Sequence, residues 1–284
     1  MFAEFKHTLR RMRGTIIAWG IGLALYALMM ASFYSTVSGM ADIMDFVENY
    51  PEEMRAFFTN MTAINTPQGY LDTYYFNLMT LIIGVFAIGT GAGLLVNDEE
   101  RGFLDLILAH PISRSALVVG RVLGYVAATA LILLIGWLGW VLPAGRSGLH
   151  LSWIEFLRPF VPLLAQLVLF GTLALLLSLL LPASRLAGMV AGALLVANYL
   201  LLGLANMNEK LKPIARFTPL YYYQGGTAVS GLNWGWLLGL CLASAVFVMA
   251  SWLLFQRRDI RVGGERSWRL PRLFRRGQEA PTVS

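Results

Sequence analysis

Long stretches without charged side chains repeat along the chain. When every Asp, Glu, Lys and Arg is marked, five gaps of 28, 25, 24, 26 and 23 residues appear, followed by one of 40. A helix needs about 20 mostly apolar residues to cross the hydrocarbon core of a membrane. Each of the first five gaps therefore predicts one crossing. The sixth gap predicts one crossing in its last two thirds, because Pro219, Gly225, Gly226 and Gly231 interrupt its first third.

The pattern predicts an all-α membrane protein with six transmembrane helices. The expected spans are 15–38, 73–96, 118–142, 159–181, 186–206 and 232–255. The expected membrane domain covers residues 1–258, and residues 259–284 form a basic cytoplasmic tail that is partly disordered. The interrupted stretch before the last span is expected to be a short extracytoplasmic, re-entrant element.

Composition excludes a soluble enzyme. Apolar residues make up 57% of the chain and charged residues 13%, whereas soluble domains have roughly 45–50% and 25%. A single cysteine excludes an intrachain disulfide and a cysteine-based metal cluster, and no metal site is expected. The net charge of +6 is concentrated in the tail beside an apolar segment, which favours contact with anionic membrane lipid over nucleic acid.

The distribution of Lys and Arg predicts the orientation. With the N-terminus inside, sixteen basic residues lie on the cytoplasmic side and six on the other. Because positive residues concentrate in cytoplasmic loops, both termini are expected inside the cell. The first thirteen residues place apolar and basic side chains on separate helical stripes. They predict either an amphipathic helix lying in the membrane interface or a basic flank that only fixes the orientation.

The loop at residues 97–115 is longer than a connection between two spans requires. Three consecutive acids open it, an apolar stretch of helical length follows, and Pro111 ends that stretch. The acids stand on the side where basic residues are favoured. A short cytoplasmic helix that binds another protein accounts for both features.

Motifs in this loop and further along the chain resemble those of the permease subunits of ABC-2-type transporters. The resemblance is carried by Glu99-Glu100-Arg101-Gly102-Phe103-Leu104-Asp105, Pro111-Ile112-Ser113-Arg114, Gly120-Arg121, Ser184-Arg185 and Pro219-Leu220-Tyr221-Tyr222. The family usually has Thr after the glycine, where this chain has Phe103. These motifs occur in the family's order around six spans and extend over nearly the whole chain to about Arg258.

The resemblance implies an assembly driven by ATP. Two six-span subunits would pair, as a homodimer or with a close paralogue, and two copies of a separate ATPase would dock beneath them. The residues that would couple to the ATPase are Glu99, Glu100, Arg101, Gly102, Pro111 and Arg114. The N-terminal segment would be a connecting helix beside this coupling helix, and the element before span six would be a gate. ATP and Mg²⁺ would be bound by the partner, since no lysine follows a glycine in this chain and a P-loop requires that pair. No catalytic residue is therefore expected here.

Polar and aromatic residues within or beside the spans are candidates for a substrate path or gate. They are Asn77, Asn198, Tyr199, Phe217, Tyr221, Tyr222 and Tyr223. The alternatives are hydrogen bonds between helices for the polar residues and an interfacial aromatic belt for the tyrosines. An apolar path favours a hydrophobic or amphiphilic substrate such as a lipid, an antibiotic or a drug, and the resemblance implies export across a bacterial or archaeal plasma membrane.

Two other classes of function fit the sequence less well. An intramembrane protease-like enzyme could use paired glutamates, but Leu104 stands where such a site needs arginine, and all three histidines lie outside the predicted spans. A secondary carrier or channel usually carries charges within its spans or an inverted repeat, and neither is evident. An ATPase that co-purifies with the chain would separate the transporter hypothesis from both.

Overall fold

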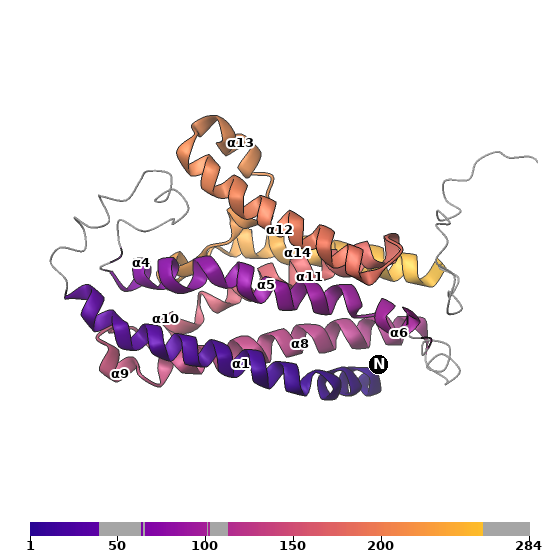
Figure 1. Ribbon diagram of the computed structural model, residues 1–284, viewed down its shortest axis with the longest axis horizontal. Coiled ribbons are helices and arrows are strands. Elements are labelled where there is room, and N and C mark those ends of the chain that lie inside the picture. The colour runs from indigo at the N-terminus through magenta and orange to yellow at the C-terminus, as the bar shows by residue number, and fades with distance from the viewer. Residues whose placement is uncertain (40–63, 65, 101, 103–112, 258–284) are drawn as a thin grey trace, which may run out of the picture.

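Six long helices make up most of the chain that the structure describes, as the sequence pattern predicts. The computed structural model describes residues 1–39, 64, 66–100, 102 and 113–257, and among them there is no strand. Six helical stretches are long and apolar enough to cross a membrane: Phe2–Val37, Pro67–Gly93, Arg114–Val141, Trp153–Leu180, Ser184–Met207 and Trp234–Arg257. Figure 1 shows them running lengthwise, with Met1 at one end of the bundle. We call this end the Met1 end and the opposite one the far end.

The first helix corrects the prediction of a separate interfacial helix. Helix α1 runs without a break over Phe2–Ser38, about 55 Å at 1.5 Å per residue, so it extends well beyond a 30 Å hydrocarbon core. Its first turns stay in line with the span because their apolar stripe packs into the bundle, where Met12 is buried and Leu9 lies against the core. The basic side chains Lys6 and Arg10 remain exposed.

The second span contains a local change of helix type. It begins with α4 (Pro67–Leu71), which Thr66 caps by accepting a hydrogen bond from the backbone N–H of Gly69. A π-helical turn, η2 (Asp72–Phe76), follows and leads into α5 (Asn77–Gly93). The short α6 (Val96–Glu100) continues the chain at the Met1 end. Single π-helical turns within α-helices often occur at functional sites.

The remaining spans pack around α11 (Phe160–Leu180). Helix α8 (Arg114–Val141) lies along α1, while α5, α12 (Ser184–Met207) and α14 (Trp234–Arg257) all contact α11. Close packing depends on small residues. A Cβ atom added to Gly91 of α5 would overlap the backbone carbonyl of Gly171 in α11.

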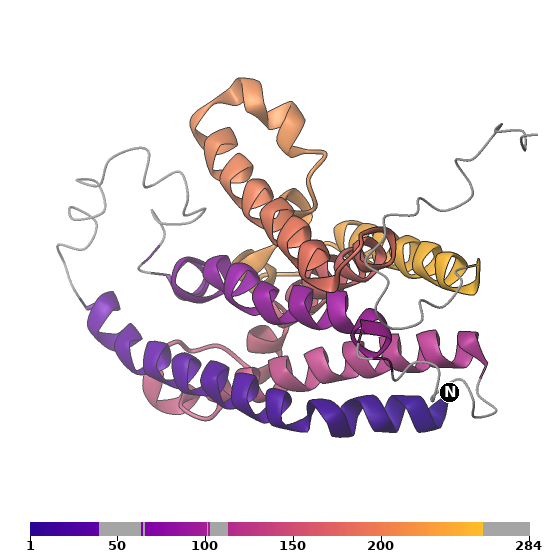
Figure 2. The same ribbon diagram turned by 45° about the vertical axis from the view of Figure 1, so that its right-hand side comes forward.

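Short helices connect the spans at the far end. Between α8 and α11 these are α9 (Ala144–Ser147) and α10 (Trp153–Leu157). Between α12 and α14 these are η3 (Glu209–Leu211), α13 (Lys212–Ala215), η4 (Pro219–Tyr222) and η5 (Gly225–Val229). Figures 1 and 2 show α12 leaving the bundle at an angle, so that α13 projects from it, while η5 folds back against α4 and η2.

Candidate functional site

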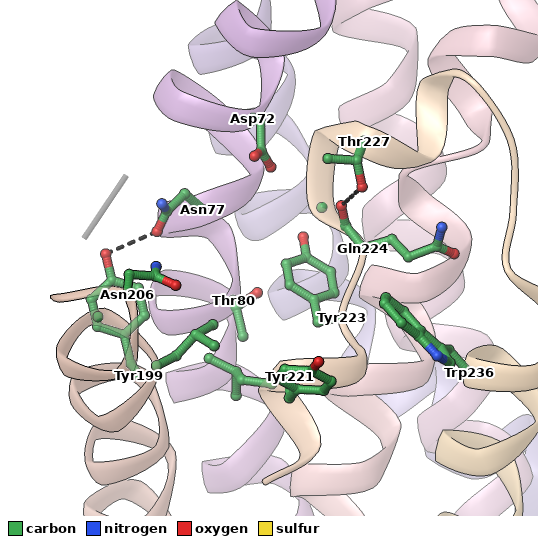
Figure 3. A pocket seen from close by; sticks show the side chains of 14 residues that line it. Asp72, Asn77, Thr80, Tyr199, Asn206, Tyr221, Tyr223, Gln224, Thr227 and Trp236 are labelled. Carbon is green, nitrogen blue, oxygen red and sulfur yellow. Dashed lines mark hydrogen bonds between the residues drawn. The ribbon is translucent and has the colours of Figure 1, made fainter. Parts of the chain in front are cut away.

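A pocket of about 290 Å³ lies where α5, α12 and the segment between η4 and η5 meet. Figure 3 shows its walls. Span two contributes Asp72, Asn77 and Thr80; α12 contributes Tyr199, Leu202, Gly203 and Asn206; the connecting segment and α14 contribute Leu220, Tyr221, Tyr223, Gln224, Gly225, Thr227 and Trp236. The pocket therefore joins span two to a later stretch of the chain that begins in α12, more than 100 positions away.

The connecting segment is fixed to span two by a backbone contact. The N–H of Gly226 donates a hydrogen bond to Oδ1 of Asp72, with N and O 2.7 Å apart. A Cβ atom at Gly226 would lie 2.6 Å from the backbone nitrogen of Asp72, so only glycine allows this approach. The neighbouring Gly225 has a φ of +51°, a left-handed conformation that glycine adopts readily. The π-helical turn and η5 thus form one wall.

Side chains reinforce the same wall. The hydroxyl of Tyr223 donates to the carbonyl oxygen of Phe76 at 3.1 Å, and burial raises the pKa of this phenol, which keeps it protonated and able to donate. The guanidinium of Arg158 donates to the carbonyl oxygen of Val229 at 2.9 Å. Because these contacts come from span two and from the start of span four, the η5 segment is held from two sides.

The opposite wall belongs to α12. The hydroxyl of Tyr199 donates to Oδ1 of Asn77 at 2.8 Å, and this bond joins α12 to α5 along one side of the pocket (Figure 3). Closer to the Met1 end, a Cβ atom at Gly84 would collide with the side chain of Leu195. A small residue of span two therefore allows span five to pack closely against it within one chain.

An aromatic cluster lies at the α14 side of the pocket. The rings of Tyr221 and Tyr222 meet edge to face at 5.3 Å between centroids, and Tyr222 meets Trp236 in the same way at 5.9 Å. Among the lining residues that the structure describes, Asp72 carries a carboxylate and none is Lys, Arg or His. The pocket offers aromatic and aliphatic surface together with hydroxyl and amide groups, which suits a molecule with an apolar body and a few hydrogen-bonding groups.

A second group of polar residues lies at the Met1 end. The buried Arg121 of α8 contacts Oδ2 of Asp98 through Nη2 at 2.6 Å, and its Nε lies 3.7 Å from Oε2 of Glu4. Arg11 completes the group with a hydrogen bond of 2.9 Å to Oδ1 of Asp98. Arg121 also donates to the carbonyl oxygen of Leu94 at 2.8 Å. The network joins α1, α6 and α8.

The ends of the loop between spans two and three contact other helices. The carboxylate of Glu100 accepts from the backbone N–H of Ser184 at 2.7 Å and from its hydroxyl at 2.9 Å. Arg114 donates to the carbonyl oxygens of Phe255 and Gln256 at 3.2 and 3.3 Å. The loop is therefore connected to the beginning of α12 and to the end of α14.

Comparison with known families decides the class of protein. A family model described as ABC-2 family transporter protein matches residues 4–260. The chain belongs to this family. A search of curated proteins finds no match. As an ABC-2 family protein with six spans, it is a multi-pass membrane permease and a component of membrane transport, not itself an ATPase.

The permease brings several of its predicted path residues together. Asn77, Tyr199, Tyr221 and Tyr223 line the pocket, and Tyr222 meets Tyr221 and Trp236 edge to face beside it. The other two candidates lie elsewhere. Asn198 donates to the carbonyl oxygen of Leu194 in its own helix, and the side chain of Phe217 is 91% exposed. Contact of any of these residues with substrate stays a prediction.

Four of the six predicted coupling residues lie within the described part of the chain, and two lie outside it. Glu99 is buried, Gly102 is exposed, and Glu100 and Arg114 contact α12 and α14 as described above. Arg101 and Pro111 lie outside the described residues, as does residue range 103–112 that was expected to form the coupling helix.

Sequence reasoning missed Asp72 and Gln224 in the pocket and the network around Arg121. The edges of the uncharged gaps are marked by Asp72, Asp98 and Arg121. Charged residues at the end of a span are usually solvated. Their burial depends on partners far along the chain, since Gly226 lies 154 positions beyond Asp72. The paired glycines at 225 and 226 were a usable signal, because adjacent glycines often mark a close approach of backbones.

Proposed function

We propose that this chain is the transmembrane subunit of an ATP-driven exporter, with ATP and Mg²⁺ bound by a separate ABC ATPase. Two copies of the ATPase would serve two permease subunits, as a homodimer or a pair of close paralogues. The pocket between span two, span five and the η4–η5 segment carries this proposal. It supplies an apolar binding site near one membrane surface, built partly from a helix that projects from the bundle.

The proposed path begins at this pocket. A hydrophobic or amphiphilic molecule, such as a lipid, an antibiotic or a drug, would place its apolar part against Tyr221 and Trp236 and its polar groups against Asn77 and Tyr199. The η4–η5 segment would act as the extracytoplasmic gate and dip into the outer leaflet. Because Gly226 binds this segment to span two, opening of the pocket would move α12 away from span two and break the bond between Tyr199 and Asn77.

The proposed orientation puts the Met1 end in the cytoplasm of a bacterial or archaeal cell. The bias of Lys and Arg supports it, because α1 and α14 both bring basic residues to that end. The proposed contact with the ATPase is the segment from Glu99 to Arg114, including Arg101, Gly102 and Pro111. The basic tail at 259–284 would then lie against anionic lipid.

Purification of the tagged full-length chain from its native membrane tests the proposal. We expect a P-loop ATPase to co-purify, with two copies for every two permease subunits by native mass spectrometry. ATP hydrolysis by that subunit should change when the permease is present. Purification of the chain alone, with transport driven by an ion gradient, would contradict the proposal and support a secondary carrier.

A further inference from the structure

Helix α12 begins without a cap of its own. Its first backbone N–H groups are orphaned, as in every helix, and the N-cap residue Ala183 has no side chain that can accept a hydrogen bond. Glu100 supplies the missing acceptor from a different part of the chain, through its two bonds to Ser184. A carboxylate at this position also interacts favourably with the positive end of the helix dipole.

A complementary contact occurs at the end of α14. The guanidinium of Arg114 donates to the carbonyl oxygens of Phe255 and Gln256 in the last turn of that helix. A cation is favoured there, because the last carbonyls carry the negative end of the dipole. The side chains of Trp252 and Gln256 bind the hydroxyl of Ser115, the next residue after Arg114. The loop between spans two and three therefore ends on two helix termini with matching charge.

The two helices that receive these contacts bury a smaller share of their residues than the central span does. Within the apolar window of α12 and that of α14, 22% of residues are buried in the bundle, against 67% for the span that contains α11. Helix α12 is continuous for 24 residues. Its beginning is bound by Glu100 at the Met1 end, and near its other end Tyr199 and Asn206 line the pocket. A displacement at Glu100 would therefore change the position of the pocket wall.

We infer that Glu100 and Arg114 act within the permease, as positioning residues that link the loop between spans two and three to α12 and α14. Glu100 is the link that moves the pocket wall, and it does so by holding the beginning of α12. This inference rests on the proposed function, because the movement of the loop would come from the ATPase. Within the segment proposed to contact the ATPase, it assigns Glu100 to span five, so that the contact with the ATPase falls on other residues of that segment.

The experiment compares Glu100→Ala with Glu100→Gln. Gln keeps an oxygen that can accept from Ser184, so it is the matched control. Spin labels at the exposed Leu142, at the end of α8, and Met207, at the end of α12, report the distance between the two helices in nanodiscs. The exposed Cys241 is changed to Ser in all variants. The full-length chain is studied with its co-purified ATPase, with and without ATP.

In the parent protein and in Glu100→Gln, ATP should shift the Leu142–Met207 distance. In Glu100→Ala the ATPase should bind to the same extent, but the shifted population should fall by roughly fivefold or more, in the range of typical coupling effects. Loss of ATPase binding in Glu100→Ala would overturn the inference, since Glu100 would then be a docking residue. A shift of normal size in Glu100→Ala would overturn it as well.

A second measurement separates this inference from the proposed function. Without ATPase, the same distance distribution should be broader in Glu100→Ala than in Glu100→Gln, because α12 has lost its restraint. An unchanged distribution would overturn the link even if the ATPase binds. Failure of the parent protein to bind any ATPase, together with a broader distribution in Glu100→Ala, would contradict the proposed function and support the structural link.

Discussion

Replacement of Gly226 by alanine should detach the η5 segment from span two. The added Cβ atom would lie 2.6 Å from the backbone nitrogen of Asp72 and 2.7 Å from its Cα. Cβ atoms in proteins essentially never come this close to another atom. Both atoms belong to the backbone of the π-helical turn, which cannot rotate away as a flexible side chain would.

The size of the effect follows from the cost of overpacking. Extra methyl groups in well-packed sites destabilise by about 1–3 kcal/mol. Since about 1.4 kcal/mol corresponds to a tenfold change in an equilibrium constant, the open form of the segment should become roughly 5 to 150 times more populated. The hydrogen bond from Gly226 to Asp72 would be strained in the same step and would add to the effect.

Hydrogen exchange measured by mass spectrometry checks this prediction. Peptides that cover η5 should exchange faster in Gly226→Ala by about that factor, while peptides of α11 should not change. Gly231→Ala is the matched control, because a Cβ atom at Gly231 meets nothing within 4 Å. Equal exchange of η5 in the two variants would refute the assigned contact with span two.

Three further substitutions test the bundle itself. Gly91→Ala should lower the free energy of unfolding by about 1–3 kcal/mol through overpacking against α11. Gly89→Ala, whose Cβ has open space, should have little effect in thermal unfolding assays. Similar losses of stability in the two variants would argue against the close contact. Arg121→Gln should cost about 3–5 kcal/mol because it removes the buried cation that contacts both Glu4 and Asp98, and Asp98 then keeps Arg11 alone of the two. The half-exposed Arg11, changed in the same way, should cost at most about 1 kcal/mol in denaturant unfolding; equal costs would contradict the buried network. Tyr199→Phe should lower stability by about 0.5–1.5 kcal/mol and broaden the α5–α12 distance measured with spin labels, and an unchanged distance would show that its bond to span two does not hold the pocket wall.

The sequence predicts the number of spans because charge is expensive in hydrocarbon. In a chain of this composition, uncharged gaps of 23 or more residues indicate membrane-spanning helices. Each of the six gaps corresponds to a long apolar helix. The same rule is poor at locating helix ends. Helix α1 begins at Phe2, well before the span predicted at 15–38, because basic residues that leave the membrane can remain helical.

The pocket was predictable only in part. Asn77 and Tyr199 stood out because polar side chains inside a span need a partner, and the structure joins them to each other. Asp72 and Gln224 did not stand out, since their place in the pocket depends on η5 folding back onto the π-helical turn. That contact is formed by a backbone amide, and a backbone amide leaves no periodic signal in the sequence.

The coupling residues show a similar limit. Glu100 was singled out from a family motif, which indicated the position but not the partner. The structure shows that its carboxylate binds the first residue of α12. A contact between a loop residue and a helix terminus 84 positions away follows from the packing of the spans, and the local sequence does not specify it.

The central claim is that an ATPase acts on this permease from the Met1 end. It would act next to the loop between spans two and three, just before Arg114. Site-specific photocrosslinking in native membranes tests it most directly, with the crosslinker in place of the exposed Ser113 and, as the control, in place of the exposed Phe217 at the far end. We predict that Ser113 captures a P-loop ATPase and that Phe217 does not. Capture from Phe217, or no capture from Ser113 in cells that contain the intact complex, would contradict the claim.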